Sequence, residues 1–403
     1  MTERADRTPI SGTCSDAFRE VGEAFRRNFA ERGEVGASLH VLVDGEPVVD
    51  LWGGTTDRDG TPWAEDTMTI VFSCTKGATA LCAHLLVDRG MLDLDAPVAE
   101  YWPEFATNGK ERATVRMMLN HSVGVPAISE RLEPGTCTDW ERMCRYLEAQ
   151  EPWWEPGTSN GYHMLTFGWT VGELVRRVSG RSLGTFFAEE VAGPLGAEFY
   201  IGLPEEAADR VCKVIAPSVN REELSEFTKT LLSDPLSLPR LAWMNSGGFE
   251  ANDPAVHRAE IGAGGGITNA RGLARMYRPL AAGGDGLVSS DTVAGMADVS
   301  VASGRDATLL LPTRFSLGYM KSMDNRRRRT GDRDSVILSS AAFGHVGAGG
   351  SIGFADPDVV LAFGYTMNRM GPGVLLNERG QSLVDATYRA LGFRSNESGV
   401  WAR

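Results

Sequence analysis

Apolar residues near the start of the chain recur first at helical and then at strand spacing. Four of them follow one another at three- or four-residue steps and predict an amphipathic helix over residues 15–32: Phe18, Val21, Phe25 and Phe29. Two apolar-rich segments, 35–43 and 46–54, flank Asp44-Gly45, a dipeptide typical of tight hairpin turns. This pattern predicts a helix followed by two antiparallel strands.

Strand patterns return only in the C-terminal part of the chain. They cover residues 315–320, 335–344, 350–355 and 359–367, and a helix over 379–391 follows them. Between the two strand regions the sequence is helical and punctuated by Gly and Pro up to about residue 205. Residues 206–260 are polar, irregular and interrupted by Pro, and we expect a mobile connection or lid there.

Strands at both ends of the chain and helices between them favour an α+β fold. The economical arrangement is one antiparallel sheet built from both ends, flanked by terminal helices, beside an all-helical lobe. We expect a single domain over residues 15–392. An α/β lobe would comprise 15–70 and 265–392, a helical lobe 71–264, and tails 1–14 and 393–403.

Composition narrows the range of partners and compartments. The 403 residues are 42% apolar, and 53 acidic against 40 basic residues give a formal net charge of −13, which argues against a nucleic-acid partner. No apolar run is long enough for a transmembrane helix, and no secretory signal precedes residue 8, so we expect a cytoplasmic protein. The six cysteines form no C-x-x-C pair, and without an export signal we expect them to be free thiols. His and Cys are scattered with no recurring ligand spacing, so we expect no metal site, and we expect no cofactor. The sequence leaves open whether the protein forms a homo-oligomer.

The segment Ser73–Lys76 places a hydroxyl and an amine three residues apart, after an apolar lead-in and at the start of a helix expected to end near Arg89. On a helix both side chains would lie on one face, one turn apart. A neighbouring base can activate the serine as a nucleophile, and the free N–H groups of a helix N-terminus suit a developing oxyanion. The alternative for so short a motif is a capping serine beside a solvated lysine.

Two further segments carry groups suited to the same chemistry. A Pro-Gly-Thr turn at 156–158 delivers Tyr162 to the start of a helix expected over 165–178. The glycine-dense stretch 343–351 enters a strand, where missing side chains let a ligand approach the backbone. A cation beside Tyr162 would lower the pKa of its phenol, and burial would lower the pKa of the lysine.

These three segments resemble, in order, the motifs of the serine β-lactamase/penicillin-recognising superfamily. The motifs are Ser73–Lys76, Tyr162 and His345-Val346-Gly347, and residues 89–98 and 114–125 resemble other segments of the family. The chain is most similar to the branch that holds class C β-lactamases, D-alanyl-D-alanine peptidases, family VIII carboxylesterases and related acyltransferases. The resemblance covers nearly the whole chain and implies a β-lactamase/transpeptidase-like fold.

The resemblance also implies roles for individual residues. Ser73 would be the nucleophile, and Lys76 and Tyr162 would share the proton transfers, with either of them as the base. The backbone N–H groups of Ser73 and Ala348 would form the oxyanion hole.

The chain departs from the lactamase pattern at two positions. Met164 replaces the Asn of the Tyr-x-Asn motif, and His345 replaces the Lys of the strand motif, which favours ester chemistry over β-lactam and peptide recognition. We expect His345, Gly347 and Met164 to contact substrate. Trp153 and Trp154 precede the Tyr162 turn and are candidates for an apolar acyl pocket.

Two other patterns have simpler explanations. Gly262–Gly266 lacks a preceding βαβ context, so we interpret it as a turn before a helix rather than a dinucleotide site. Arg326–Arg329 is typical of a solvated loop, with an anionic substrate as the alternative.

Three functions remain open from the sequence. The leading hypothesis is a serine hydrolase that cleaves small carboxylic esters through an acyl-Ser73 intermediate. The second is an acyltransferase, in which an amine or alcohol of a small metabolite resolves the same intermediate. The third is a scaffold that has lost catalysis. The expected partner is a small-molecule ester or acyl substrate, with no nucleic acid and no membrane.

Overall fold

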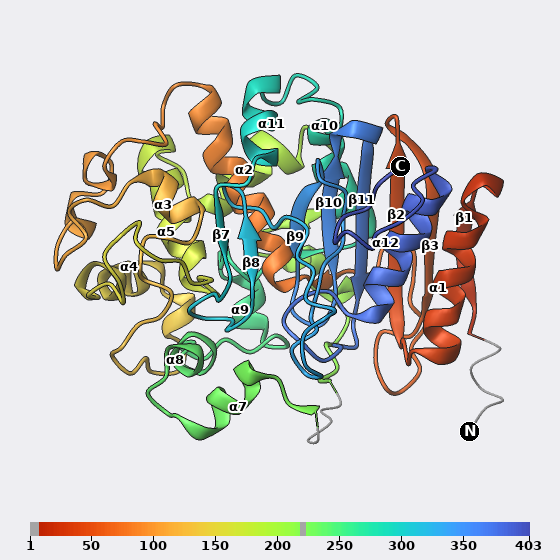
Figure 1. The fold of residues 1–403 in the computed structure, drawn as a ribbon, viewed down its shortest axis with the longest axis horizontal. Helices are drawn as coiled ribbons and strands as arrows, with labels where there is room; N and C mark the ends of the chain where they lie inside the picture. Colours follow the sequence, from red (N-terminus) through yellow and green to blue (C-terminus); the bar gives the residue numbers. More distant parts are fainter. Residues whose placement is uncertain (1–7, 218–222) are drawn as a thin grey trace.

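The structure is a computed structural model that describes residues 8–217 and 223–403 (Figure 1). Residues 1–7 of the expected N-terminal tail and residues 218–222 of the expected lid lie outside the described part. None of the helices in the described ranges is long and apolar enough to cross a membrane.

Six antiparallel strands form the main sheet, in the order β1-β3-β2-β11-β10-β9. The hairpin around Asp44-Gly45 supplies β2 and β3, and β11 pairs with β2 and so joins the hairpin to the C-terminal strands. The strands are β1 Ile10–Cys14, β2 Gly36–Val43, β3 Glu46–Gly54, β9 Phe343–Val346, β10 Ile352–Asp356 and β11 Leu361–Met367. The sheet is built from both ends of the chain, as the hydrophobic pattern predicts.

Helices cover both faces of this sheet. The terminal helices α1 (Arg19–Glu31) and α12 (Glu378–Ala390) pack together on one face, and α10 (Ala270–Ala281) packs against β10, β11 and β2 (Figure 1). On β10 and β11, the rings of Phe354 and Phe363 stack at 5.0 Å and continue onto α12. The next residue of β11, Gly364, faces the opposite side of the sheet, because successive positions of a strand alternate between its two faces. A Cβ at Gly364 would lie 2.2 Å from a backbone oxygen of α10, so glycine lets that helix lie directly on the sheet.

The central segment folds into a helical region around α2 (Thr75–Asp88). Every residue of α2 from Thr75 to Leu86 is buried, which is the pattern of a helix surrounded by protein on all sides. Helices α5 and α6 pack against it. The remaining helices of this half are α3 Val115–Leu119, α4 Trp140–Ala149, α5 Thr166–Ser179, α6 Leu183–Phe187 with a π-helical continuation Ala188–Ala192, and α11 Ser290–Ala297. A small sheet joins the two halves in the order β4-β6-β5, with β4 Thr69–Ile70, β5 Phe199–Tyr200 and β6 Ile267–Thr268.

The segment 206–260 is more regular than expected. It holds three short helices, α7 Glu226–Ser233, α8 Leu238–Met244 and α9 Pro254–Arg258. Pro239 and Pro254 occupy the first turns of α8 and α9, where a missing N–H costs nothing, and polar residues before them cap the helices. The prolines and polar residues that predict a loop are therefore helix-start signals here.

Two of the predicted C-terminal strands are shorter than expected. The segment 315–320 contributes only the end of β8 (Thr313–Phe315), which pairs with β7 (Val301–Ser303). In 335–344 the apolar run is buried, but its amides bond to side chains: Ile337 N donates to Gln381, Leu338 N to Ser322 and Ser339 N to Tyr388. Side-chain acceptors thus replace most of the strand pairing that the pattern predicts.

Both expected tails are partly built into the fold. Residues 10–14 form β1, and every residue of β1 pairs with a residue of β3. Near the other end Trp401 is buried, its Nε1 donates to Asp385 at 3.1 Å, and its ring stacks on Tyr388 at 5.8 Å. Both segments are stabilised by residues distant in sequence, so their local patterns do not reveal them.

We expect Trp401→Ala to destabilise the protein by about 3–5 kcal/mol, the usual loss when a buried aromatic is truncated. Urea unfolding measures this change. Trp153→Ala is the control, since Trp153 is 37% exposed and its truncation should cost less. An unfolding free energy within about 1 kcal/mol of wild type for Trp401→Ala would show that the C-terminal segment is a dispensable tail.

Candidate active site

Ser73 lies in a 3-10 turn, Phe72–Cys74, that continues directly into α2. The hydrogen bonds of this turn begin with the amides of Cys74 and Thr75, which donate to the carbonyls of Val71 and Phe72. The Ser73 N–H precedes them and is one of the free donors at the start of the helix. Phe72 has a φ of 45°, a left-handed conformation that bulky residues rarely adopt and that is typical of functional sites.

Lys76 lies one turn further along and is fully buried. Its Nζ is 3.1 Å from Ser73 Oγ and donates to the carbonyl oxygens of Met164 at 2.6 Å and Ala263 at 2.9 Å. No carboxylate of the described chain forms an ion pair with it. Burial holds the pKa of Lys76 well below its ordinary value, as the sequence predicts. A solvated lysine, the alternative for this motif, is thereby excluded.

The three partners of the amine match the requirements of its uncharged form. A neutral amine has two N–H donors and one lone pair, and the carbonyls of Met164 and Ala263 accept the two donors. The lone pair is then free to accept the proton of the third partner, Ser73 Oγ. The geometry therefore suits a base that is poised to deprotonate the serine.

The glycine-rich stretch Gly262–Gly266 supplies one of these carbonyls. As expected it forms a turn, which leads through β6 to α10. Thr79 donates to the Gly262 carbonyl at 2.6 Å and Thr75 accepts from Gly266 N at 2.9 Å, so the turn is fastened to α2. The sequence pattern gives no sign of this contribution to the lysine site.

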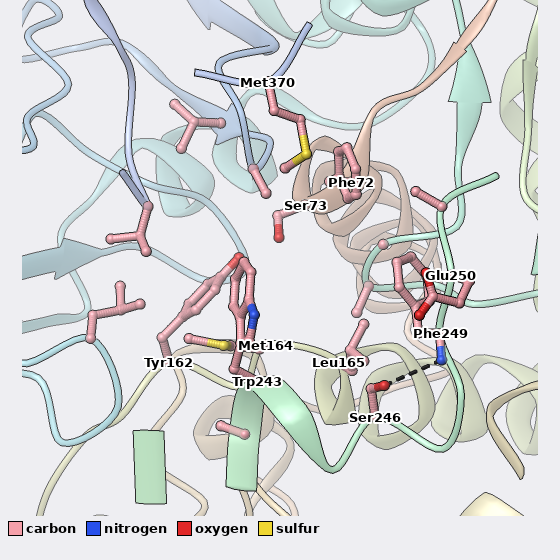
Figure 2. Close-up of a pocket in the computed structure, with 18 residues that line it drawn as sticks. Phe72, Ser73, Tyr162, Met164, Leu165, Trp243, Ser246, Phe249, Glu250 and Met370 are labelled. Carbon is pink, nitrogen blue, oxygen red and sulfur yellow. Dashed lines mark hydrogen bonds between the residues drawn. The ribbon is translucent and has the colours of Figure 1, made fainter. Parts of the chain in front are cut away.

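Tyr162 approaches Ser73 from the segment before α5. Figure 2 shows its phenol oxygen pointing toward the Ser73 hydroxyl, and its ring lies 4.7 Å from Lys76 Nζ. Burial raises the pKa of Tyr162, and the approach to Ser73 lowers it by less. The expectation of a lowered phenol pKa is wrong, because burial of the phenol outweighs the interaction that lowers its pKa. Tyr162 is therefore a neutral phenol, able to donate a proton.

The strand β9 and the turn after it complete the site. Ala348 lines the same pocket as Ser73. Within that turn Gly347 N donates to Ser351 O at 2.7 Å and Gly350 N donates to Gly347 O at 3.0 Å. The placement agrees with the oxyanion hole that the resemblance implies for the N–H groups of Ser73 and Ala348.

Close packing holds β9 against the start of α2. A Cβ on Gly347 would lie 2.2 Å from the carbonyl oxygen of Val71, so only glycine fits there. The Cys74 thiol donates to the carbonyl of His345 at 3.2 Å, and burial raises its pKa, which makes it a structural thiol. Gly347 thus acts through backbone packing and does not line the pocket.

His345 is placed behind the site rather than in it. It is 1% exposed, it is absent from the pocket lining, and its ring centroid lies 5.9 Å from that of Tyr162. Its Nδ1 donates to the Val346 carbonyl at 2.7 Å, and burial lowers its pKa to about 3. An uncharged, covered imidazole cannot serve as a carboxylate anchor.

A pocket of about 260 Å³ opens in front of Ser73, and its walls are mainly apolar (Figure 2). Met164 lines it, as expected. Its aromatic wall is formed by Phe72, Trp243 and Phe249, of which the last two come from α8 and the segment after it. The expected lid region therefore does border the site, although its aromatic residues carry no signal that identifies them from sequence.

The two tryptophans proposed for an acyl pocket lie elsewhere. Trp153 Nε1 donates to Ala127 O at 3.1 Å and Trp154 Nε1 to Ser122 O at 3.0 Å, so both indoles fasten the loop after α3 and neither lines the pocket. The Arg326–Arg329 run also lies outside the lining, and Arg326 and Arg329 pair with nearby carboxylates. Within the described ranges no three His, Cys, Asp or Glu side chains gather to hold a metal ion.

Comparisons with known proteins show the family of this chain. Residues 23–387 match the family described as Beta-lactamase. The chain belongs to the β-lactamase family. A relative from Mycobacterium tuberculosis, Esterase/beta-lactamase LipL, is 37% identical over 390 residues, covering 92% of this chain and 86% of the relative.

Solved structures of this family superpose over nearly the whole chain. A family VIII carboxylesterase is 37% identical with a TM-score of 0.83, covering 95% of this chain and 100% of that one. A penicillin-binding protein homologue from Caulobacter crescentus is 34% identical with a TM-score of 0.84 and the same coverage. The β-lactamase-like fold predicted from the sequence is confirmed.

The buried amine gives a pH-dependent prediction for Lys76→Met. Unfolded lysine is protonated below about pH 10.4, whereas the folded amine is uncharged, so the unfolded state binds more protons and wild-type stability falls as pH is lowered. The unfolding free energy of Lys76→Met minus that of wild type should increase by up to about 1.4 kcal/mol for each pH unit below pH 10. Urea unfolding at pH 7, 8.5 and 10 measures it. A pH-independent difference would show that Lys76 stays charged when folded.

Proposed function

We propose that this protein is a serine hydrolase that cleaves small carboxylic esters through an acyl-Ser73 intermediate. One observation carries the proposal: Lys76 Nζ lies 3.1 Å from the Oγ of Ser73, a residue that lines the apolar pocket, and Lys76 is fully buried without a carboxylate partner in the described chain. A serine beside an uncharged amine is an activated nucleophile. A scaffold that had lost catalysis would have no reason to keep so costly a buried group.

The acylation step proceeds through Ser73, Lys76 and Tyr162. Lys76 Nζ takes the proton of Ser73, and Oγ attacks the ester carbonyl while the N–H groups of Ser73 and Ala348 stabilise the oxyanion. The bond from the acyl carbon to the alcohol oxygen then breaks. The neutral Tyr162 phenol donates a proton to the departing alkoxide, and the proton held on Lys76 restores the phenol. Water repeats the sequence in reverse to release the acid.

The pocket favours an uncharged ester with an apolar group. Among the described residues, Glu250 is the only charged one that lines it, and no described Lys or Arg does. An anionic substrate such as a β-lactam would find no cation there to bind its carboxylate. The names of the relatives, an esterase/β-lactamase and a family VIII carboxylesterase, support the same reaction class.

We also propose a cytoplasmic location. All six cysteines are free, and five of them are buried. Unpaired thiols in this number fit a reducing compartment better than an oxidising one.

We expect Ser73→Ala to lower kcat for a short-chain p-nitrophenyl ester by roughly 10³–10⁶-fold, the range for removing a nucleophile. The melting temperature should stay close to that of wild type, since one hydroxyl is lost. Ser246→Ala is the matched control, because Ser246 also lines the pocket, and it should keep turnover within a few fold. A Ser73→Ala enzyme that retains a tenth of wild-type kcat would refute Ser73 as the nucleophile.

We expect nitrocefin to be a much poorer substrate than the best ester. Met164 offers no side-chain hydrogen bond to a lactam amide, and the covered, uncharged His345 cannot bind the carboxylate. The measurement is kcat/KM for nitrocefin beside kcat/KM for a series of p-nitrophenyl esters, with the same enzyme preparation. Comparable values would mean that the pocket recognises β-lactams without a cationic residue.

A further inference from the structure

Tyr162 belongs to a stretch of chain that has no secondary structure of its own. Residues 159–163 lie between the turn at 156–158 and α5 and belong to no helix or strand. The phenol oxygen has no hydrogen-bond partner among the described residues. The direction of the ring must therefore be set by what holds its backbone and by what packs against it.

One side of this stretch is held by Asp306, a completely buried residue in the loop between β7 and β8. The amide of Tyr162 donates to both carboxylate oxygens, at 3.0 and 3.1 Å. The amides of Thr308 and Leu309 donate to Oδ1 at 2.9 and 2.8 Å, which fixes the carboxylate in its own loop. Asn160 Nδ2 and Thr313 Oγ1 approach Oδ2 at 3.4 and 3.3 Å.

The other side is held by His121, which follows α3. Its carbonyl accepts from Gly161 N at 3.2 Å and its ring Nδ1 accepts from His163 N at 3.2 Å. Its φ of 68° is left-handed, a conformation uncommon for residues other than glycine, although His, Asn and Asp adopt it more often than most. The imidazole also packs against the rings of Tyr162 and Phe315, at 5.0 and 4.7 Å.

Three consecutive amides are thus bound alternately by two residues. Gly161 and His163 bond to His121, and Tyr162 between them bonds to Asp306. In an extended chain successive N–H groups point to opposite sides, so the two residues grip the segment from both sides. The ring of Tyr162 stacks on Phe315 at 5.8 Å and 8°, which completes its support.

We propose that Asp306 and His121 are positioning residues that together clamp the backbone of Tyr162 so that its phenol faces Ser73. This inference rests on the proposed function, because it assigns the clamp to the proton transfers of ester cleavage. Neither residue lines the pocket or touches Ser73, and both act through Tyr162. Both residues are buried polar groups that the catalytic steps themselves leave unused.

The protonation state of each residue is set by its partners. Every group around Asp306 can donate, which suits a carboxylate, although burial raises the pKa of Asp306 against these bonds. His121 Nδ1 accepts a hydrogen bond, so the ring is uncharged, and burial lowers its pKa well below the ordinary value. Variants of His121 therefore test geometry without changing charge.

The first experiment is a double-mutant cycle between Asp306→Asn and Tyr162→Phe with a p-nitrophenyl ester. The side-chain amide of Asn would place N–H donors against backbone N–H groups that now donate to the Asp306 carboxylate. We therefore expect kcat to fall about 10–100-fold, which is part of the 10²–10⁴-fold effect usually contributed by a positioned proton donor. KM should change less than about threefold, since the pocket walls are untouched. In the Tyr162→Phe background Asp306→Asn should lower kcat less than about twofold, because its effect requires the hydroxyl.

The chain offers a matched control in Asp356. This carboxylate is also completely buried and accepts from Ser339 Oγ at 2.6 Å and Tyr388 Oη at 2.8 Å, at the end of β10 and outside the pocket lining. Asp356→Asn should lower the melting temperature while kcat stays within about twofold of wild type. Equal losses of kcat in Asp306→Asn with and without the Tyr162 hydroxyl, or an unchanged kcat, would overturn the proposal.

Two variants of His121 keep the proposal testable if Asp306→Asn fails to fold. Asparagine can place Oδ1 where Nδ1 lies and adopts left-handed conformations readily. His121→Asn should therefore retain kcat within about fivefold, whereas His121→Ala, which loses the acceptor, should lose at least tenfold. A His121→Ala enzyme as active as His121→Asn, at matched melting temperatures, would contradict the clamp.

A second readout separates this inference from the proposed function. The rate at which a fluorophosphonate labels Ser73 reports activation of the serine and needs no knowledge of the natural substrate. If wild type is labelled but cleaves no ester, the proposed function fails, and the variants are then ranked by labelling rate alone. If wild type cleaves esters and all clamp variants match it in kcat and labelling rate, the clamp fails while the proposed function stands.

Discussion

An uncharged lysine amine beneath a serine hydroxyl is the arrangement on which the site depends. Lys76 is buried with no carboxylate partner in the described chain, and its two N–H donors reach the carbonyls of Met164 and Ala263, which lie 88 and 187 residues further along. A charged amine would be costly to bury in this setting, so burial itself makes the group a base. Three distant segments must meet around α2 for this to happen.

The fold brings those segments together by burying α2 on every side. Helices α5 and α6, the turn before β6, and β9 all pack around it, and three of these regions contribute to the site. The turn supplies a carbonyl, β9 leads to the oxyanion turn, and the chain before α5 presents Tyr162. Because burial raises the pKa of Tyr162 and lowers the pKa of Lys76, the site is suited to hold a proton donor and a base for one proton relay.

The sequence predicts those parts of the site that depend on short spacing. A hydroxyl and an amine at i and i+3 share a helix face wherever the helix forms, so Ser73 and Lys76 can be found without a structure. The hairpin and terminal helices follow equally from their patterns. The direction of the Tyr162 pKa shift, the aromatic wall of Trp243 and Phe249, and the support from Asp306 depend on tertiary burial and on backbone amides. Such contacts carry no local signature, and the choice between water and another acyl acceptor has none either.

The most direct test of this account is the ionisation of Lys76 itself. In protein labelled with ¹³C-lysine, the Cε resonance of Lys76, assigned by its loss in Lys76→Met, reports the charge of the amine across a pH titration. The account predicts a pKa for Lys76 well below the ordinary value, so that the amine is uncharged while the enzyme is active. A Lys76 resonance that titrates near the usual value of about 10.4 would contradict the neutral base and with it the proposed mechanism.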